Sequence, residues 1–469
     1  MTPSGMTKRE AIPEIVMQGD VLAPLISSLQ VDTMGKECLE EAKHLYHYKD
    51  LVPIPPLGLV DDLFTITTCG YKTNLMNKFI NTKSAMKKLQ FGTSKCVKLH
   101  VGKTYSKTLC GDLHVDGWKV NVVSDDITGQ TFQEEVFAGQ VKMDQKDEQK
   151  YLGDMISKDG KHDKNISMRK NKSIGIINQI MEILNSVYYG KYHFEVALIL
   201  RSSLLLSSIL LNSEAWVNLS HNNIRSLEQI DETLLSRILE CEPNTSNAMK
   251  YLELGLYPIR FELMKRNILF LQYILKQEKS SMIYQVLKAT WEKPIKNDFV
   301  KTCEKYLDIL DIKLSFEEIE NMSVWSFKKL VRFKTKEAGL KYLLGEKERQ
   351  SKTVQIQYKE LAIQEYLVDG HCNKDLSQLI FKARSQTIDI KMQQKWKYAD
   401  KICIGCKTRE ESGDELLLCE KLNYKNRVAE NPIRYDWFFS STVSDMVKVG
   451  LLMKKGLKAR DKILEAGVT

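Results

Sequence analysis

The stretch Leu57–Thr67, LGLVDDLFTIT, carries the strongest fold signal in this 469-residue sequence. Two runs of apolar and β-branched residues flank Asp61 and Asp62, which tolerate tight turns. The stretch is therefore predicted to form a β-hairpin with the two acids at its tip. A helical pattern follows over residues 74–89. Strand, turn, strand and helix in this order predict a layer of strands packed against helices.

The rest of the chain has a helical pattern. From residue 166 onward, apolar residues recur every three or four positions, as in 174–187 and 227–238, which predicts amphipathic helices. The chain has only 24 Gly and 10 Pro residues, and 43% of it is hydrophobic, which excludes collagen-like and wholly disordered classes. The expected fold class is α+β, mostly α.

The most apolar run, 196–211, is about 16 residues long and contains Arg201. A membrane-spanning helix needs about 20 residues, so we expect a buried helix and no membrane association. Ten cysteines without a signal-peptide pattern after Met1 predict reduced thiols in an intracellular protein. A net charge of +9 suits a polyanionic partner without requiring one.

Asp61 and Asp62 are candidate metal ligands. Two adjacent carboxylates at a hairpin tip offer the oxygen ligands that divalent cations prefer. Such acids serve two-metal phosphoryl transfer, in which the cations clamp the attacking and leaving oxygens. The alternative is a solvated surface turn, where aspartate is common.

Further short motifs surround the Asp pair in a fixed order. They are Gln18–Leu25 (QGDVLAPL), Leu59–Asp62 (LVDD), Lys95, Tyr151-Leu152-Gly153, Ala215-Trp216 and Tyr251–Gly255 (YLELG). In this order they resemble the reverse transcriptase of non-LTR (LINE-type) retrotransposons, from the second half of the palm through the thumb and linker. The resemblance divides the chain into a partial palm (1–165), a helical thumb (166–276), a helical linker (277–375) and a basic, Cys-rich module (376–469).

The resemblance implies RNA-directed DNA polymerase activity, in which a DNA 3′-hydroxyl attacks a dNTP with the help of two Mg²⁺ ions. It implies an RNA template and a DNA primer or target as partners, and the nucleus as the location of an active element, with the cytoplasm as the alternative. The implied roles are metal ligation by Asp61 with Asp62 beside it, shaping of the nucleotide and template pocket by Gln18, Gly19 and Pro24, and protonation of pyrophosphate by Lys95.

Two departures from the family pattern affect the expected activity. Leu59 stands where the family has an aromatic residue, and the family's other catalytic aspartate lies before the Gln-Gly block, where only 17 residues precede Gln18. The chain resembles a truncated C-terminal part of the polymerase, so we expect that it does not extend a primer by itself. The alternatives are a non-catalytic nucleic-acid-binding protein and an inert remnant of a retroelement.

A second constellation lies near the C-terminus. Cys403 and Cys406 are followed, after twelve residues, by Cys419, and a CxxC pair with a distant third thiolate is typical of zinc sites. The segment resembles the Cys-Cys-His-Cys knuckle of the same elements, with Glu415 in the place of the histidine. Zinc could take Glu415, Asp414 or a water as its fourth ligand, which predicts a looser site. The alternative is three reduced cysteines without a metal.

Lys395, Trp396 and Lys397 lie just before this cluster. Lysines beside a ring that can stack on bases suit single-stranded nucleic acid, although solvated lysines around a buried tryptophan would give the same pattern. The later basic run Lys448–Lys462 is expected to be an exposed helix face.

Overall fold

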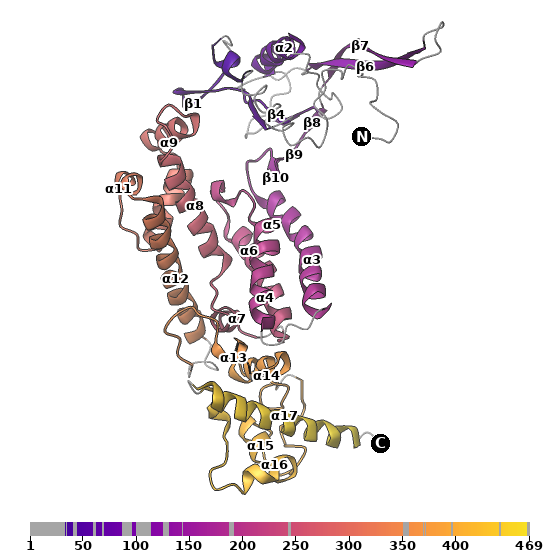
Figure 1. Ribbon diagram of the computed structural model, residues 1–469, viewed down its shortest axis with the longest axis vertical. Coiled ribbons are helices and arrows are strands. Elements are labelled where there is room, and N and C mark those ends of the chain that lie inside the picture. Colours follow the sequence, from indigo (N-terminus) through magenta and orange to yellow (C-terminus); the bar gives the residue numbers. More distant parts are fainter. Residues whose placement is uncertain are drawn as a thin grey trace, which may run out of the picture. The chain divides into compact units, whose positions relative to one another are not determined.

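The computed structural model describes most of the chain as two compact units (Figure 1). The described residues are 33, 35–40, 45–59, 62–67, 70–86, 96–99, 114–124, 131–142, 144–186, 192–242, 245–349, 356–368, 370, 372–394, 397–439 and 442–466. The first unit comprises Met1–Tyr151, Ile156–Gly160 and Gln277–Pro294, and the second comprises Leu152–Met155, Lys161–Lys276 and Ile295–Thr469. The four-part division drawn from the sequence remains a prediction.

The first unit contains the predicted hairpin. Strands β3 (Leu57–Leu59) and β4 (Asp62–Phe64) pair antiparallel, with Leu57 opposite Phe64 and Leu59 opposite Asp62. The prediction that Asp62 lies in the turn is wrong, because Asp62 begins the second strand. Helix α2 (Gly70–Met86) follows, so the predicted helix is confirmed, and it begins four residues earlier than the pattern indicated. Met76 and Ile80 of this helix are buried together with Cys38 and Leu45 in a small core.

The other strands described also lie in pairs. β1 (Tyr46–Tyr48) pairs antiparallel with β2 (Val52–Ile54), β5 (Val97–Leu99) pairs parallel with β8 (Asp144–Lys146), β6 (His114–Ser124) pairs antiparallel with β7 (Thr131–Lys142), and β9 (Glu148–Tyr151) pairs with β10 (Asp154–Ser157). Helix α9 (Met282–Glu292) packs against β2 through Ala289. Residues 277–294 thus belong to the first unit, although they lie far along the chain.

The second unit is helical, and helices make up most of the chain that the structure describes. Its elements are α3 (Asp163–Ser186), α4 (His193–Leu200), η3 (Arg201–Leu206), α5 (Ser207–Ile209), η4 (Ser213–Ala215), α6 (His221–Leu239), α7 (Asn247–Glu253), α8 (Ile259–Leu275), α10 (Phe299–Ile309), α11 (Phe316–Asn321), α12 (Val324–Glu348), α13 (Glu365–Val368), α14 (Lys374–Arg384), α15 (Gly413–Leu418), α16 (Glu420–Arg427), η6 (Tyr435–Phe439) and α17 (Val443–Ala466). The α+β, mostly α expectation is confirmed at this level.

Helix α6 shows why the apolar periodicity predicted the core. Ser220 caps its first turn by accepting a hydrogen bond from the backbone N–H of Asn223 at 3.1 Å. The predicted apolar positions Leu227, Ile230, Leu234, Leu235 and Ile238 are all buried. They face α3, where Ile177, Ile180 and Leu184 complete the contact.

The apolar run 196–211 is helical with one buried face, as expected of an amphipathic helix, and Ile199 and Leu211 lie on its exposed side. It forms α4, the π-helical turn η3 and α5. Arg201 is buried in η3 and donates to both carboxylate oxygens of Asp231 at 2.6 and 2.7 Å, and Tyr251 donates to the same carboxylate. Within the described ranges, no helix has the length and apolar character that crossing a bilayer demands.

A second buried carboxylate connects three segments of the second unit. Glu253, at the end of α7, accepts hydrogen bonds from Tyr358 at 2.5 Å, from Tyr366 of α13 at 2.9 Å and from Arg384 of α14 at 2.9 Å. None of these side chains is more than about a tenth exposed. One hydrophobic core continues from α3 and α6 through this network to α17.

Gly255 lies two residues after the end of α7, and both its backbone conformation and its close neighbours restrict substitution. Its φ is +66°, and an added Cβ would lie 2.4 Å from the carbonyl carbon of Ala362. Gly255→Ala is therefore expected to destabilise the second unit by at least about 1–2 kcal/mol, the cost of left-handed backbone alone. Gly345→Ala on α12, where an added Cβ meets no atom within 4 Å, should instead stabilise by about 0.5–1 kcal/mol. Urea denaturation of both variants tests this, and equal midpoints would contradict it.

Candidate metal centre

A tight loop presents the first two cysteines of the C-terminal cluster. Ile402 and Glu410 form an isolated antiparallel bridge that closes the loop. The Cys403 N–H donates to the carbonyl oxygen of Arg409 at 2.7 Å, and Lys407 takes a left-handed conformation with φ of +57°. The backbone of the loop thus brings the side chains of Cys403 and Cys406 to the same side.

Helix α15 supplies the other two candidate ligands. Ser412 caps the helix and accepts a hydrogen bond from the Glu415 N–H at 3.0 Å. Cys419 follows the last residue of the helix, and its N–H donates to the carbonyl oxygen of Glu415 at 2.7 Å. Because positions four apart share a helix face, Glu415 and Cys419 point toward the same loop.

The ligand atoms of Cys403, Cys406, Glu415 and Cys419 all lie within 4.8 Å of one another. The Sγ atoms of Cys403 and Cys419 are 3.8 Å apart, and Cys406 Sγ lies 3.2 Å from Glu415 Oε1. A tetrahedral zinc with Zn–S bonds of about 2.3 Å and a Zn–O bond of about 2.0 Å requires separations of about 3.8 Å and 3.5 Å for these pairs. These two pairs are thus close to the spacing of a tetrahedral zinc site, and the four side chains could hold a metal ion.

Burial has the largest effect on the pKa values of two thiols of the cluster. Burial raises the pKa of the Cys403 thiol to about 12, and the neighbouring Cys419 adds to the rise. Burial also acts to raise the pKa of Cys406, but hydrogen bonds with Thr408 hold that pKa below its usual value. Arg409 lies 3.6 Å from the carboxylate of the buried Glu415. Zinc binding would replace the thiol protons and pair the buried carboxylate.

The surroundings of the cluster favour a closed site. Cys403 and Cys419 belong to the main hydrophobic core, together with Leu416 and Leu422. A Cβ on Gly405 would lie 3.0 Å from Cys419 Sγ and equally close to Leu422, so glycine permits the close approach of the loop to the helix. Neither Gly405 nor Arg409 was singled out from the sequence, because their roles depend on contacts with residues that follow at a distance along the chain.

Asp414 does not reach the cluster. Its carboxylate accepts a hydrogen bond from the backbone N–H of Tyr435 at 3.0 Å. Of the two acids that the sequence offered as a fourth ligand, the structure brings only Glu415 to the cysteines.

Of the other predicted site residues, the structure describes two, Asp62 and Lys397, and neither lies at the cysteine cluster. Asp62 begins β4 opposite Leu59, and only its backbone position is described. Lys397 makes an ion pair with Asp389 at 2.6 Å, so its charge is already paired within the fold. The others lie outside the described residues: Gln18, Gly19, Pro24, Asp61, Lys95, Lys395 and Trp396.

A residue that follows the Asp pair lies next to one of the other quoted motifs. Phe64, two residues after Asp62 in β4, has its ring centroid 5.1 Å from that of Tyr151 at the end of β9. These residues are 87 positions apart in the sequence, so folding, not chain proximity, places them together.

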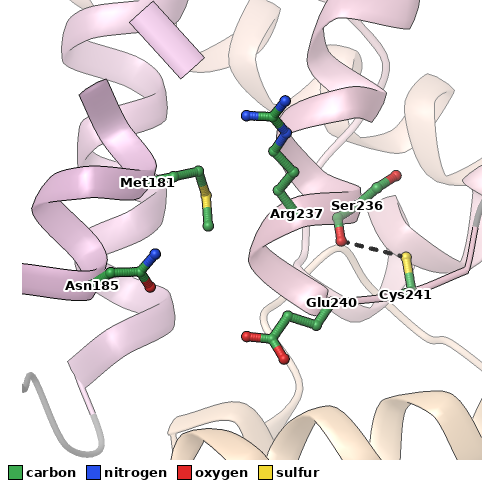
Figure 2. A pocket seen from close by; sticks show the side chains of 6 residues that line it. All are labelled: Met181, Asn185, Ser236, Arg237, Glu240 and Cys241. Carbon is green, nitrogen blue, oxygen red and sulfur yellow. Dashed lines mark hydrogen bonds between the residues drawn. The ribbon is translucent and has the colours of Figure 1, made fainter. Parts of the chain in front are cut away.

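A shallow pocket lies between α3 and the end of α6 (Figure 2). Its lining includes Met181, Arg237, Glu240 and Cys241. Arg237 donates to Asn178 at 2.6 Å, and Glu240 pairs with Lys374 at 2.8 Å. Burial raises the pKa of the Cys241 thiol, which makes it a poor nucleophile. The pocket therefore holds a hydrogen-bonded arginine, an ion-paired glutamate and a thiol of low reactivity.

No protein-family model matches the chain, and comparison with curated proteins and with solved structures gives no match.

Proposed function

We propose that this chain is part of a non-LTR retrotransposon reverse transcriptase, and that its C-terminal module (376–469) is a nucleic-acid-binding unit held by one structural zinc ion. The observation that carries the proposal is the cluster of Cys403, Cys406, Glu415 and Cys419, at the place where the resemblance puts the family's knuckle. The contact between Phe64 and Tyr151 supports the palm part, because it places the strand that carries Asp62 beside the Tyr151-Leu152-Gly153 motif.

Zinc in this module would have a structural role. Three thiolates and a carboxylate fill a tetrahedral shell, whereas catalytic zinc keeps a position open for water or substrate. The metal would fix the loop 403–406 against α15. Lys395, Trp396 and Lys397 precede this loop in the sequence, and lysines beside a tryptophan ring are suited to phosphates and bases.

In the palm, the proposal assigns Asp61, with Asp62 beside it, to Mg²⁺ and to polymerisation of dNTPs on an RNA template from a DNA primer. The nucleus is the location proposed for an active element. A non-catalytic role in binding RNA or DNA is the second candidate. The closed four-ligand cluster favours it, because a structural zinc can support binding without any polymerase activity. A primer-extension assay with a homopolymer template and Mg²⁺ or Mn²⁺ is expected to give no product from this chain by itself. Product that Asp61→Ala abolishes would contradict this and show that another acid completes the polymerase site.

Glu415 is expected to limit the affinity for zinc. Imidazole nitrogen is a better zinc ligand than a single carboxylate oxygen in a thiolate-rich site, so Glu415→His should tighten zinc binding by about tenfold. Glu410→His, on the exposed side of the same loop, is the matched control and should leave the affinity unchanged. Competition with a chromophoric chelator measures both variants. Equal affinities in the wild type and in Glu415→His would place residue 415 outside the coordination shell.

The link between zinc and nucleic acid has its own test. Zinc-loaded and chelator-treated protein are compared for binding to RNA at low and moderate salt, where lysine–phosphate contacts give a marked salt dependence. The proposal predicts weaker binding after chelation. Equal binding by the zinc-free protein would show that the cysteines have no part in recognition.

A further inference from the structure

Helix α12 presents an outward face that packing within the second unit leaves uncovered. Its inner face is fixed by Phe327, Val331, Thr335 and Leu343, all of which are buried, and α12 packs on α8. Ser323 caps the helix and accepts a hydrogen bond from the Ser326 N–H at 3.1 Å. The rotation of the helix about its axis is therefore determined, and so is the set of residues that points away from the core.

Two large rings lie on that outward face. Trp325 is 72% exposed and Phe333 is 63% exposed, and with Lys329 between them they follow i, i+4, i+8 spacing along one stripe. The Lys329 Nζ lies 5.2 Å from the centre of the Trp325 ring. Together with Ser326 and Leu330, these residues line a shallow, mostly apolar groove. Exposed rings gathered in this way mark an interaction surface rather than scattered surface residues.

The same face is strongly positive. Lys328, Lys329, Arg332 and Lys336 are exposed, and residues 324–336 contain no acidic side chain. Lys334 of the same segment forms ion pairs with Asp311 and Glu337, so it is not counted among the lysines of this face. The charge of the stripe thus suits a polyanion, and the rings suit flat aromatic groups.

We propose that the outward face of the N-terminal half of α12 binds single-stranded RNA, with Trp325 and Phe333 stacking on bases and Lys328, Lys329, Arg332 and Lys336 contacting phosphates. Paired bases in a duplex are stacked on one another and closed to side-chain rings, whereas single strands can splay their bases onto them. The choice of RNA rests on the proposed function. The surface itself involves none of the zinc-cluster residues.

The test measures binding of fluorescent oligo-U RNA to the full chain by anisotropy. Alanine at Trp325 or at Phe333 should weaken binding by about 5- to 100-fold each. Trp291→Ala, an exposed tryptophan on α9 beside the paired Lys288 and Glu292, is the control and should change little. The double variant Lys328→Ala/Arg332→Ala should reduce the slope of log affinity against log salt by about 1.4. Lys301→Ala/Lys305→Ala, with the same spacing on α10, should not.

The outcomes separate this surface from the zinc module. Loss of RNA binding in the α12 variants, with circular dichroism unchanged, supports the inference even if chelation has no effect. Binding that chelation abolishes and the α12 variants leave intact would overturn the inference while the proposed function stands. Equal binding of duplex RNA, binding of oligo-dT but not oligo-U, or binding only to vesicles rich in phosphatidylserine would also overturn it.

Discussion

Glu253→Ala is expected to destabilise the second unit by about 3–5 kcal/mol, because it removes one partner of a buried ion pair and leaves the other charge uncompensated. Arg384 would keep its buried guanidinium without the carboxylate that accepts from it at 2.9 Å. Tyr358 and Tyr366 would each lose the acceptor of their hydroxyl group. Because Glu253 connects α7 to α13 and α14, the loss is expected to spread to all three helices.

The measurement is denaturant unfolding of the full chain, combined with hydrogen exchange that follows α7 and α14. Glu304→Ala is the control, since Glu304 pairs with Lys301 at 2.7 Å on the surface of α10, and such pairs contribute at most about 1 kcal/mol. Glu253→Gln keeps a hydrogen-bond acceptor for Arg384 and the two tyrosines, so its loss of unfolding free energy should lie between those of Glu253→Ala and Glu304→Ala. Equal destabilisation by Glu253→Ala and Glu304→Ala would show that the buried network does not hold these helices together.

Withdrawing zinc from the loaded protein is expected to unfold the segment around residues 401–422 while α6 and α8 stay folded. Structural zinc contributes directly to folding, and free zinc at about 1,000 times its Kd adds about 4 kcal/mol to the folded state. Without the metal, the buried carboxylate of Glu415 faces three thiols and keeps Arg409 as its nearby cation.

Amide hydrogen exchange, measured with and without chelator, reports which segments unfold when zinc is withdrawn. Loss of amide protection is expected in the loop 403–410 and in α15, and to a smaller degree in α17, whose Arg460 makes a buried ion pair with Glu411 at 3.0 Å. Full protection of the loop after chelation would contradict a metal that holds it.

Local pattern was enough to predict much of the fold. The β-prone runs on both sides of Asp61 and Asp62 predicted the hairpin, and the apolar spacing of α6 predicted its buried face. The same spacing was misleading at Ile174, which is 58% exposed. The buried stripe of α3 runs through Ser173 instead, and a hydropathy pattern does not assign a serine to the core.

The buried ion pairs could not be predicted from local pattern. Arg201 and Asp231 are 30 residues apart, and Glu253 and Arg384 are 131 residues apart, so no spacing rule connects them. In the metal centre, the cysteine spacing predicted three ligands and left Asp414 and Glu415, besides a water, as alternatives for the fourth. The choice between them follows from the backbone of Tyr435, which binds Asp414.

The metal content of the purified chain tests the central claim most directly. Elemental analysis of protein prepared without added chelator is expected to give about one zinc per chain for the wild type and for Cys241→Ser, whose thiol lies outside the cluster. Cys403→Ser/Cys419→Ser, which removes two of the four ligands, is expected to give none. Zinc absent from the wild type after growth with zinc, or equally present in all three proteins, would contradict a structural zinc at Cys403, Cys406, Glu415 and Cys419.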